Sequence, residues 1–123
     1  MCIRDRLRKT AALLASCARM GAILGGGSPA QVDALGKYGT RLGLLFQVTD
    51  DILDETGSFE EMGKGIAKDR ARGKWTYPVA HGMPAAVERA SELERAALDA
   101  VSTFGAEADP LRELVGMVRN RRK

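Results

Sequence analysis

The sequence predicts an all-α protein of about four helices and one functional loop. It has only four prolines, and it lacks the alternation of apolar and polar residues that is typical of β-strands. Its long apolar stretches are bounded by glycine or proline, as helices commonly are. At 123 residues, with 45% hydrophobic and 28% charged residues, the composition is that of a globular chain with one domain at most.

The first helix is expected over residues 9–24. Only Arg19 strongly resists burial within its apolar part, and three consecutive glycines at 25–27 should end it. Residues 1–6 show no helical pattern and contain too few apolar side chains for a signal peptide. We interpret them as a non-native N-terminal remnant.

The second helix should begin where a serine precedes a proline. Ser28 is expected as the N-cap, Pro29 takes the first helical position, and Gln31 completes a capping box. The apolar pattern then continues to about residue 54 or 55. Gly57 should stop the helix.

A polar, glycine-punctuated loop is expected over residues 58–77, followed by two more helices. The third helix should span residues 85–101, and the fourth should start at Asp109 as N-cap with Pro110 in its first turn. The residues expected together on one side of the third helix are Val87, Ala90, Glu94, Ala97 and Val101. The stripe expected for the fourth is Leu111, Leu114, Val115 and Val118.

Three carboxylates follow the apolar run at residues 42–49, and they are the strongest functional signal. At 100° per residue, Gln47, Asp50, Asp51 and Asp54 fall within an arc of about 100° on the second helix. Like charges held together away from water are costly unless a cation compensates them. Because the ligands are hard oxygens, Mg²⁺ or Mn²⁺ is favoured over zinc. The alternative is an acidic helix end without a metal.

The same face of the second helix carries a stripe of small residues. Gly36, Thr40 and Gly43 lie on the arc that leads to the three aspartates. The stripe has two interpretations, close packing of another helix or room for a long ligand that ends at a metal. The rest of the helix is apolar all round, which predicts that it is buried within a bundle.

Charge is unevenly distributed, although the formal net charge is only +3. An acidic segment at residues 50–61 is followed directly by a basic one at residues 62–74, and the tail is basic again. This order favours a metal site beside a phosphate site. Nucleic-acid binding is not expected, because the bases are split between a loop and the terminus without interleaved aromatic residues.

Two cysteines supply neither a disulfide framework nor a metal cluster, which favours a reducing, cytoplasmic setting. No apolar run approaches the roughly 18 to 20 residues that would span a membrane. No membrane span is therefore expected.

Several ordered motifs resemble the C-terminal half of the trans-polyprenyl diphosphate synthases, with the best fit to the farnesyl and geranylgeranyl diphosphate synthase group. The motifs are Lys9-Thr10-Ala11-Ala12-Leu13-Leu14, the run 42–48 leading into Asp50-Asp51-Ile52-Leu53-Asp54, Gly63-Lys64, Asp69, and Gly73-Lys74-Trp75-Thr76-Tyr77-Pro78. The resemblance covers residues 7–123. It implies part of an isoprenoid synthase helical bundle.

The resemblance also implies a reaction, its cofactor and its site. Members join an allylic diphosphate to isopentenyl diphosphate with Mg²⁺ and two aspartate-rich motifs, and Asp50, Asp51 and Asp54 match the second motif. The residues implied to stabilise the allylic cation are Lys9 through its carbonyl, Thr10 and Gln47. The residues implied to bind diphosphate are Lys64, Lys74, Arg121, Arg122 and Lys123.

Because the first aspartate-rich motif does not occur in the 123 residues, the chain alone is expected to be inactive. A homodimer is expected for the full-length synthase. A non-catalytic partner subunit of such a synthase remains an alternative. A terpene cyclase relative is disfavoured, because that class carries an Asn/Ser/Glu metal motif at the position of this second DDxxD.

Overall fold

The computed structural model describes residues 3–60 and 81–121, and within these ranges it contains helices and no strand. The helices are α1 (Ile3–Leu24), α2 (Pro29–Glu60), α5 (Met83–Ala100), the short 3-10 helix η1 (Ala106–Ala108) and α6 (Asp109–Asn120). The prediction of an all-α fold is confirmed. The predicted loop is helical at residues 58–60 and otherwise lies outside the described residues.

The first helix starts earlier than the sequence pattern indicated. α1 begins at Ile3 rather than at residue 9. Residues 3–8 contain neither glycine nor proline and include arginine and leucine, which are good helix formers. The predicted end is confirmed, because Gly26 adopts a φ of 79° and the Gly27 N–H donates to the Ala22 carbonyl at 2.8 Å.

The start of α2 is the predicted capping box. The Gln31 N–H donates to Ser28 Oγ at 3.2 Å, and the Ser28 N–H donates to Gln31 Oε1 at 2.8 Å. Pro29 is the first residue of the helix, where its missing N–H costs nothing.

The predicted end of this helix is wrong. α2 continues through Gly57 to Glu60 instead of stopping near residue 55. A glycine inside a helix costs about 1 kcal/mol relative to alanine, which weakens a helix without ending it. Among the described glycines, a positive φ occurs at Gly26 and Gly82, and both lie just outside a helix.

The third predicted helix is present but turned about its axis relative to the expected face. α5 begins at Met83, after Gly82 with a φ of 89°. Val87 is 41% exposed, so it does not belong to the core. The buried side instead consists of Ala86, Ala90, Leu93 and Ala97, with Val101 just beyond the helix.

The start of α6 differs by one residue from the prediction. Ala108 is the N-cap, and Asp109 is the first helical residue, because η1 leads directly into the helix. The Asp109 carboxylate accepts a hydrogen bond from Arg112 at 2.7 Å instead of capping the helix. Val115 is fully buried as expected, whereas Leu114 is 39% exposed.

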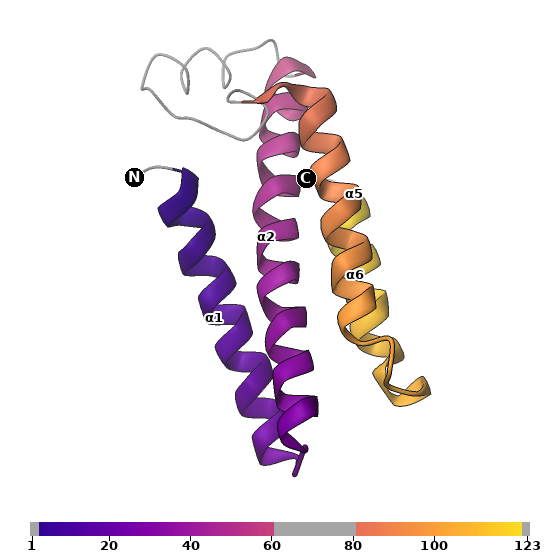
Figure 1. Ribbon diagram of the computed structural model, residues 1–123. Coiled ribbons are helices and arrows are strands. Elements are labelled where there is room, and N and C mark those ends of the chain that lie inside the picture. The colour runs from indigo at the N-terminus through magenta and orange to yellow at the C-terminus, as the bar shows by residue number, and fades with distance from the viewer. Residues whose placement is uncertain (1–2, 61–80, 122–123) are drawn as a thin grey trace.

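Helix α2 is the centre of the bundle, with α1 on one side and α5 and α6 on the other (Figure 1). The hydrophobic core lies on the α5 and α6 side. It consists of Tyr38, Leu42, Leu45, Val48, Ala90, Leu93, Ala97, Val101 and Val115. Within the described part of the chain, no helix is long and apolar enough to cross a membrane.

The contact between α1 and α2 is built from glycine and alanine. A Cβ added at Gly43 would lie 2.7 Å from the Ala11 Cα, and one at Gly39 would lie 2.6 Å from the Leu14 carbonyl oxygen. Only glycine allows the two backbones to approach so closely. Gly43 belongs to the predicted small-residue stripe and Gly39 lies beside it, so at Gly43 the stripe packs another helix, the first of its two interpretations.

The opposite face of α1 is apolar and exposed. Leu13, Met20, Ile23 and Leu24 have exposed fractions of 65%, 57%, 61% and 88%. Ala11, Ala15 and Ala22 on the other face are buried against α2. α1 is thus apolar on two sides and covered on one within the described residues.

Candidate metal centre

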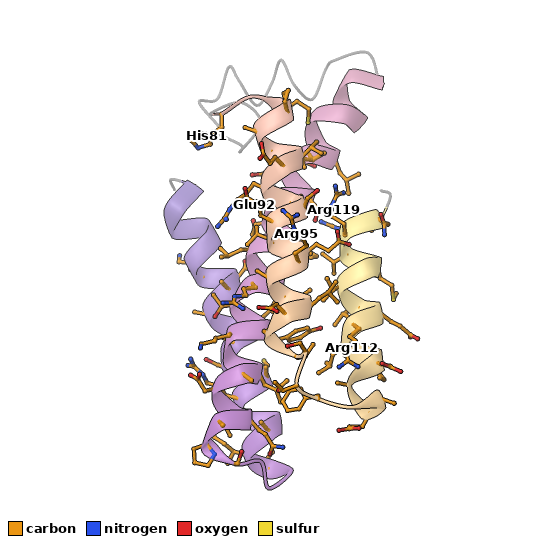
Figure 2. All side chains as sticks on the ribbon, turned by 45° about the vertical axis from the view of Figure 1, so that its right-hand side comes forward. His81, Glu92, Arg95, Arg112 and Arg119 are labelled. Atoms are coloured by element: carbon orange, nitrogen blue, oxygen red, sulfur yellow. The ribbon has the colours of Figure 1, made fainter. Side chains whose placement is uncertain are left out.

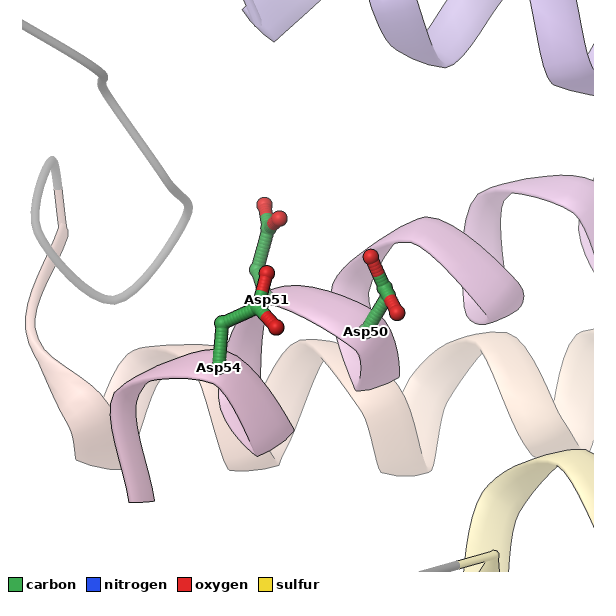
Figure 3. Close-up of side chains that lie close together, drawn as sticks. All are labelled: Asp50, Asp51 and Asp54. Carbon is green, nitrogen blue, oxygen red and sulfur yellow. The ribbon is translucent and has the colours of Figure 1, made fainter. Parts of the chain in front are cut away.

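The three predicted aspartates converge on one side of α2 (Figure 3). Asp51 is 1% exposed, and Asp50 and Asp54 are half-buried. One carboxylate oxygen from each lies within 4.8 Å of those of the other two. The spacing of i, i+1 and i+4 on a continuous helix produces this grouping. The cluster lies inside α2 rather than at its end, which argues against the interpretation as an acidic helix end.

The cluster has the chemistry and nearly the size that a magnesium ion requires. Ligands on opposite sides of Mg²⁺ are about 4.2 Å apart, because each Mg–O distance is about 2.1 Å. The three carboxylate oxygens lie within 4.8 Å of one another, so they are grouped on the scale of one magnesium coordination shell. All three donors are carboxylate oxygens, which suit magnesium or manganese better than zinc. The residues therefore fit the metal that the sequence predicted.

Two of the predicted cation-stabilising residues lie side by side next to the cluster. Gln47 Nε2 donates to Thr10 Oγ1 at 3.0 Å, which joins α2 to α1. Gln47 is 9% exposed and precedes Asp51 by four residues, so both lie on the same face of α2. Lys9 adjoins Thr10 within α1, and its side chain is exposed.

The tail residue Arg121 reaches the cluster from beyond the end of α6. Its guanidinium Nη2 lies 3.3 Å from Asp50 Oδ1 and 3.3 Å from the Phe46 carbonyl oxygen. The guanidinium carbon is also 4.3 Å from the centre of the Phe46 ring. The predicted diphosphate-binding arginine thus contacts a predicted metal ligand.

Four other predicted site residues cannot be placed. Lys64, Lys74, Arg122 and Lys123 lie outside the described residues. Their proposed contact with diphosphate remains a prediction from the sequence.

The sequence interpretation missed Phe46, which it counted only as part of the apolar run. Phe46 is 36% exposed, and its ring lies beneath Arg121. The signal was available, because Phe46 precedes Asp50 by four residues and so occupies the same helical face. An aromatic ring there offers an arginine a cation–π partner beside the carboxylate.

A cavity lies between α2 and the end of α6, on the Arg121 side of the cluster. Its volume is about 280 Å³, and it is lined by Thr49, Ile52, Leu53, Arg119, Asn120 and Arg121. Arg119 donates to Ser91 Oγ at 3.4 Å and so connects α6 to α5 (Figure 2). The Nε atoms of Arg119 and Arg121 are both buried, and neither has a hydrogen-bond partner among the described residues. Two cations therefore line this end of the bundle.

Comparison with known proteins gives one matching family model and several similar proteins. The model described as polyprenyl synthetase matches residues 5–110. The chain is 43% identical over 118 residues to "Heterodimeric geranylgeranyl pyrophosphate synthase large subunit 2" of Arabidopsis thaliana, covering 95% of this chain and 31% of the relative. It is 47% identical over 118 residues to "Geranylfarnesyl diphosphate synthase, chloroplastic" of Leucosceptrum canum, covering 95% and 32%.

A third relative is "Geranylgeranyl pyrophosphate synthase 11, chloroplastic" of Arabidopsis thaliana. It is 45% identical over 113 residues, covering 91% of this chain and 32% of the relative. The chain thus spans about a third of the length of the curated relatives it matches.

Proposed function

Because the chain belongs to the polyprenyl synthetase family, we propose that it is the C-terminal part of a short-chain prenyl diphosphate synthase. The whole enzyme would join an allylic diphosphate to isopentenyl diphosphate, with a farnesyl- or geranylgeranyl-type product. One observation carries this proposal. The Asp50, Asp51 and Asp54 carboxylates converge on α2 beside the hydrogen-bonded Thr10 and Gln47.

The three aspartates would hold magnesium at the allylic diphosphate. Bound magnesium supplies positive charge that neutralises the departing diphosphate. Around it, the Lys64 and Lys74 ammonium groups would add charge on the same oxygens. Such groups act most strongly in a site that excludes water, because charge interactions strengthen as the local dielectric falls.

The Thr10 hydroxyl and the Gln47 amide would face the carbocation that forms when the diphosphate leaves. Gln47 Nε2 donates to Thr10 Oγ1 at 3.0 Å, and this hydrogen bond fixes the amide group. The Oε1 atom of the amide would then face the carbocation. An amide oxygen and a hydroxyl offer dipoles to a cation without a base that would remove a proton early. The Lys9 carbonyl is the third such dipole in this proposal.

The remaining assignments concern the basic tail, the oligomeric state and the cellular location. Arg121, Arg122 and Lys123 would contact the isopentenyl diphosphate. We further propose a homodimer for the full-length synthase and a cytoplasmic location, although two of the relatives are named chloroplastic.

A second candidate function is a non-catalytic partner subunit. A relative named as a subunit of a heterodimeric synthase shows that subunit pairing occurs among similar proteins. In both proposals the cluster binds metal and diphosphate.

Calorimetric titration with geranyl diphosphate tests the metal and diphosphate assignment. We expect binding that requires magnesium and that Asp51→Asn weakens about tenfold or more, since loss of even an indirect metal partner costs about 10- to 100-fold. Asp33→Asn is the matched control, because it removes one exposed carboxylate from the same helix. Equal affinities for wild type and Asp51→Asn would contradict the assignment.

Product formation tests the expected inactivity of the chain. Purified protein given geranyl diphosphate, isopentenyl diphosphate and magnesium should yield no longer prenyl diphosphate. Detection of an extended product by mass spectrometry would show that one aspartate cluster suffices.

A further inference from the structure

Arg121 is held on α2 by three contacts that come from two residues of that helix. Its guanidinium pairs with Asp50 at 3.3 Å, donates to the Phe46 carbonyl at 3.3 Å and covers the Phe46 ring at 4.3 Å. Asp50 and Phe46 are 71 and 75 residues away in the chain. The end of α6 is therefore bound to one of the three aspartates of the candidate metal centre.

We propose that Arg121 is a latch that a divalent cation releases from Asp50. The proposal rests on the proposed function, in which Asp50 is a metal ligand. Without metal, the guanidinium occupies the Asp50 carboxylate and closes the α6 end onto α2. A cation at the three aspartates takes over that carboxylate and displaces the guanidinium.

The two occupants compete for Asp50 because both are cations with the same partner. A magnesium ligand oxygen lies about 2.1 Å from the metal, closer than the guanidinium lies to Asp50 here, and the metal carries twice the charge. Asp51 and Asp54 add ligands for the metal that Arg121 does not contact in the described structure. The exchange therefore favours the metal when enough of it is present.

The Phe46 ring gives the latch a second position. Its contact with Arg121 does not involve Asp50, so it persists when the carboxylate is taken. An arginine held over that ring stays next to the cluster with its hydrogen-bond donors free. A diphosphate next to the metal, which is that of isopentenyl diphosphate in the proposed function, would supply the new acceptor, since guanidinium groups pair well with phosphate oxygens. Arg121 would then exchange a carboxylate partner for a phosphate partner.

Manganese binding measured by electron paramagnetic resonance tests the competition directly. In the 123-residue protein, Arg121→Gln should bind Mn²⁺ about two- to fivefold more tightly than wild type, as expected for loss of a half-exposed ion pair. Lys37→Gln is the control. It removes one positive charge from α2 about 20 Å away along the helix, beyond the screening length at 0.1 M salt. Its Mn²⁺ affinity should equal that of wild type.

A second variant and a second measurement keep the test independent of one substitution. Phe46→Leu leaves all three carboxylates in place but removes the ring that holds Arg121 in both positions. It should leave the affinity for Mn²⁺ alone close to that of wild type, but it should weaken the protection that pyrophosphate restores at the end of α6. In wild type, saturating Mn²⁺ should accelerate amide hydrogen exchange at residues 117–121, which are the last turn of α6 and the residue that follows it. Inorganic pyrophosphate added with Mn²⁺ should restore protection there, because it gives Arg121 a new partner.

The outcomes separate the latch from the metal site. Equal Mn²⁺ affinity in wild type and Arg121→Gln would overturn the latch and leave the metal site intact. Weaker binding in Arg121→Gln would also overturn it, because Arg121 would then support the site instead of competing for it. Failure of every variant to bind Mn²⁺, with or without pyrophosphate, would overturn the metal assignment and the latch together.

Discussion

The two sides of α2 are built by opposite means. Towards α1, Gly39 and Gly43 let the backbones meet, and the partner residues are alanines such as Ala11. Towards α5 and α6, large side chains fill the space, and Leu45 and Val115 are fully buried. Both sides are well packed. The α1 side is a close contact between two backbones, whereas the α5 and α6 side is filled by large side chains.

We expect the two sides of α2 to have different roles, because one stabilises the fold and the other positions residues of the candidate site. Burial of large apolar side chains is the main favourable term in folding, so the α5 and α6 side should contribute most of the stability. The α1 side buries less apolar surface, but its close approach brings Thr10 to Gln47. We therefore expect substitutions on the first side to unfold the protein and those on the second to disturb the candidate site first.

The largest expected effect is on the α5 and α6 side. Leu45→Ala should lower the free energy of unfolding by about 2–5 kcal/mol, because it leaves a cavity in the core. Leu24→Ala makes the same chemical change at a position that is 88% exposed, and it should change stability by less than about 0.5 kcal/mol. Urea titration followed by circular dichroism measures both. Similar losses in the two variants would contradict the assignment of the core.

On the α1 side, addition of a single methyl group should be harmful. Gly43→Ala should destabilise the protein by about 1–3 kcal/mol, because the new Cβ would lie 2.7 Å from the Ala11 Cα. Gly21→Ala is the control, since no atom in the described part of the chain lies within 4 Å of a Cβ there, and it should stabilise α1 by up to about 1 kcal/mol. If both changes stabilise, the backbones of α1 and α2 are not in close contact.

How far the sequence predicted this molecule depended on the range of each interaction. Ser28 and Gln31 are three residues apart, and their reciprocal capping was predicted correctly from that spacing alone. The grouping of Asp50, Asp51 and Asp54 is equally local, so the helical period was enough to predict it. Local signals failed at Gly57, because a glycine within a helix and one that ends it look alike in sequence.

Features that depend on a distant partner were missed. The buried face of α5 includes Leu93 rather than Val87, because the orientation of the helix is set by what it packs against. The pairing of Arg121 with Asp50 joins residues 71 positions apart, and no local pattern predicts it. The small-residue stripe had two interpretations until α1 was seen against Gly43.

A loss similar to that of Gly43→Ala is expected where Arg112 of α6 contacts the residues just beyond the end of α5. Arg112 donates to the Val101, Phe104 and Gly105 carbonyls and to the Asp109 carboxylate (Figure 2). The Val101 and Gly105 carbonyls also accept backbone N–H groups, from Phe104 and Ala108. Hydrogen bonds to a charged group are worth about 1.5–3 kcal/mol, so Arg112→Ala should cost about that much. Arg89→Ala removes an arginine with one exposed partner, Glu92, and should cost less than about 1 kcal/mol. Thermal unfolding compares the two, and equal shifts would show that the carbonyl contacts contribute little.

The smallest expected effect concerns Tyr38, which connects α2 to α6 on the side of the large residues. Its hydroxyl donates to the Leu111 carbonyl at 2.8 Å, and burial raises the pKa of the phenol to about 12 from 10.0. Because the folded protein holds this proton more tightly than the unfolded chain, the stabilisation is fully present below pH 10. It is lost as the pH rises towards 12.

Tyr38→Phe should cost about 1 kcal/mol at pH 7, the usual net contribution of one hydrogen bond. The variant should also lose less stability than wild type between pH 9 and 12, measured by urea titration at each pH. A wild-type stability that falls no faster than that of Tyr38→Phe over this range would show that the phenol is not buried between α2 and α6.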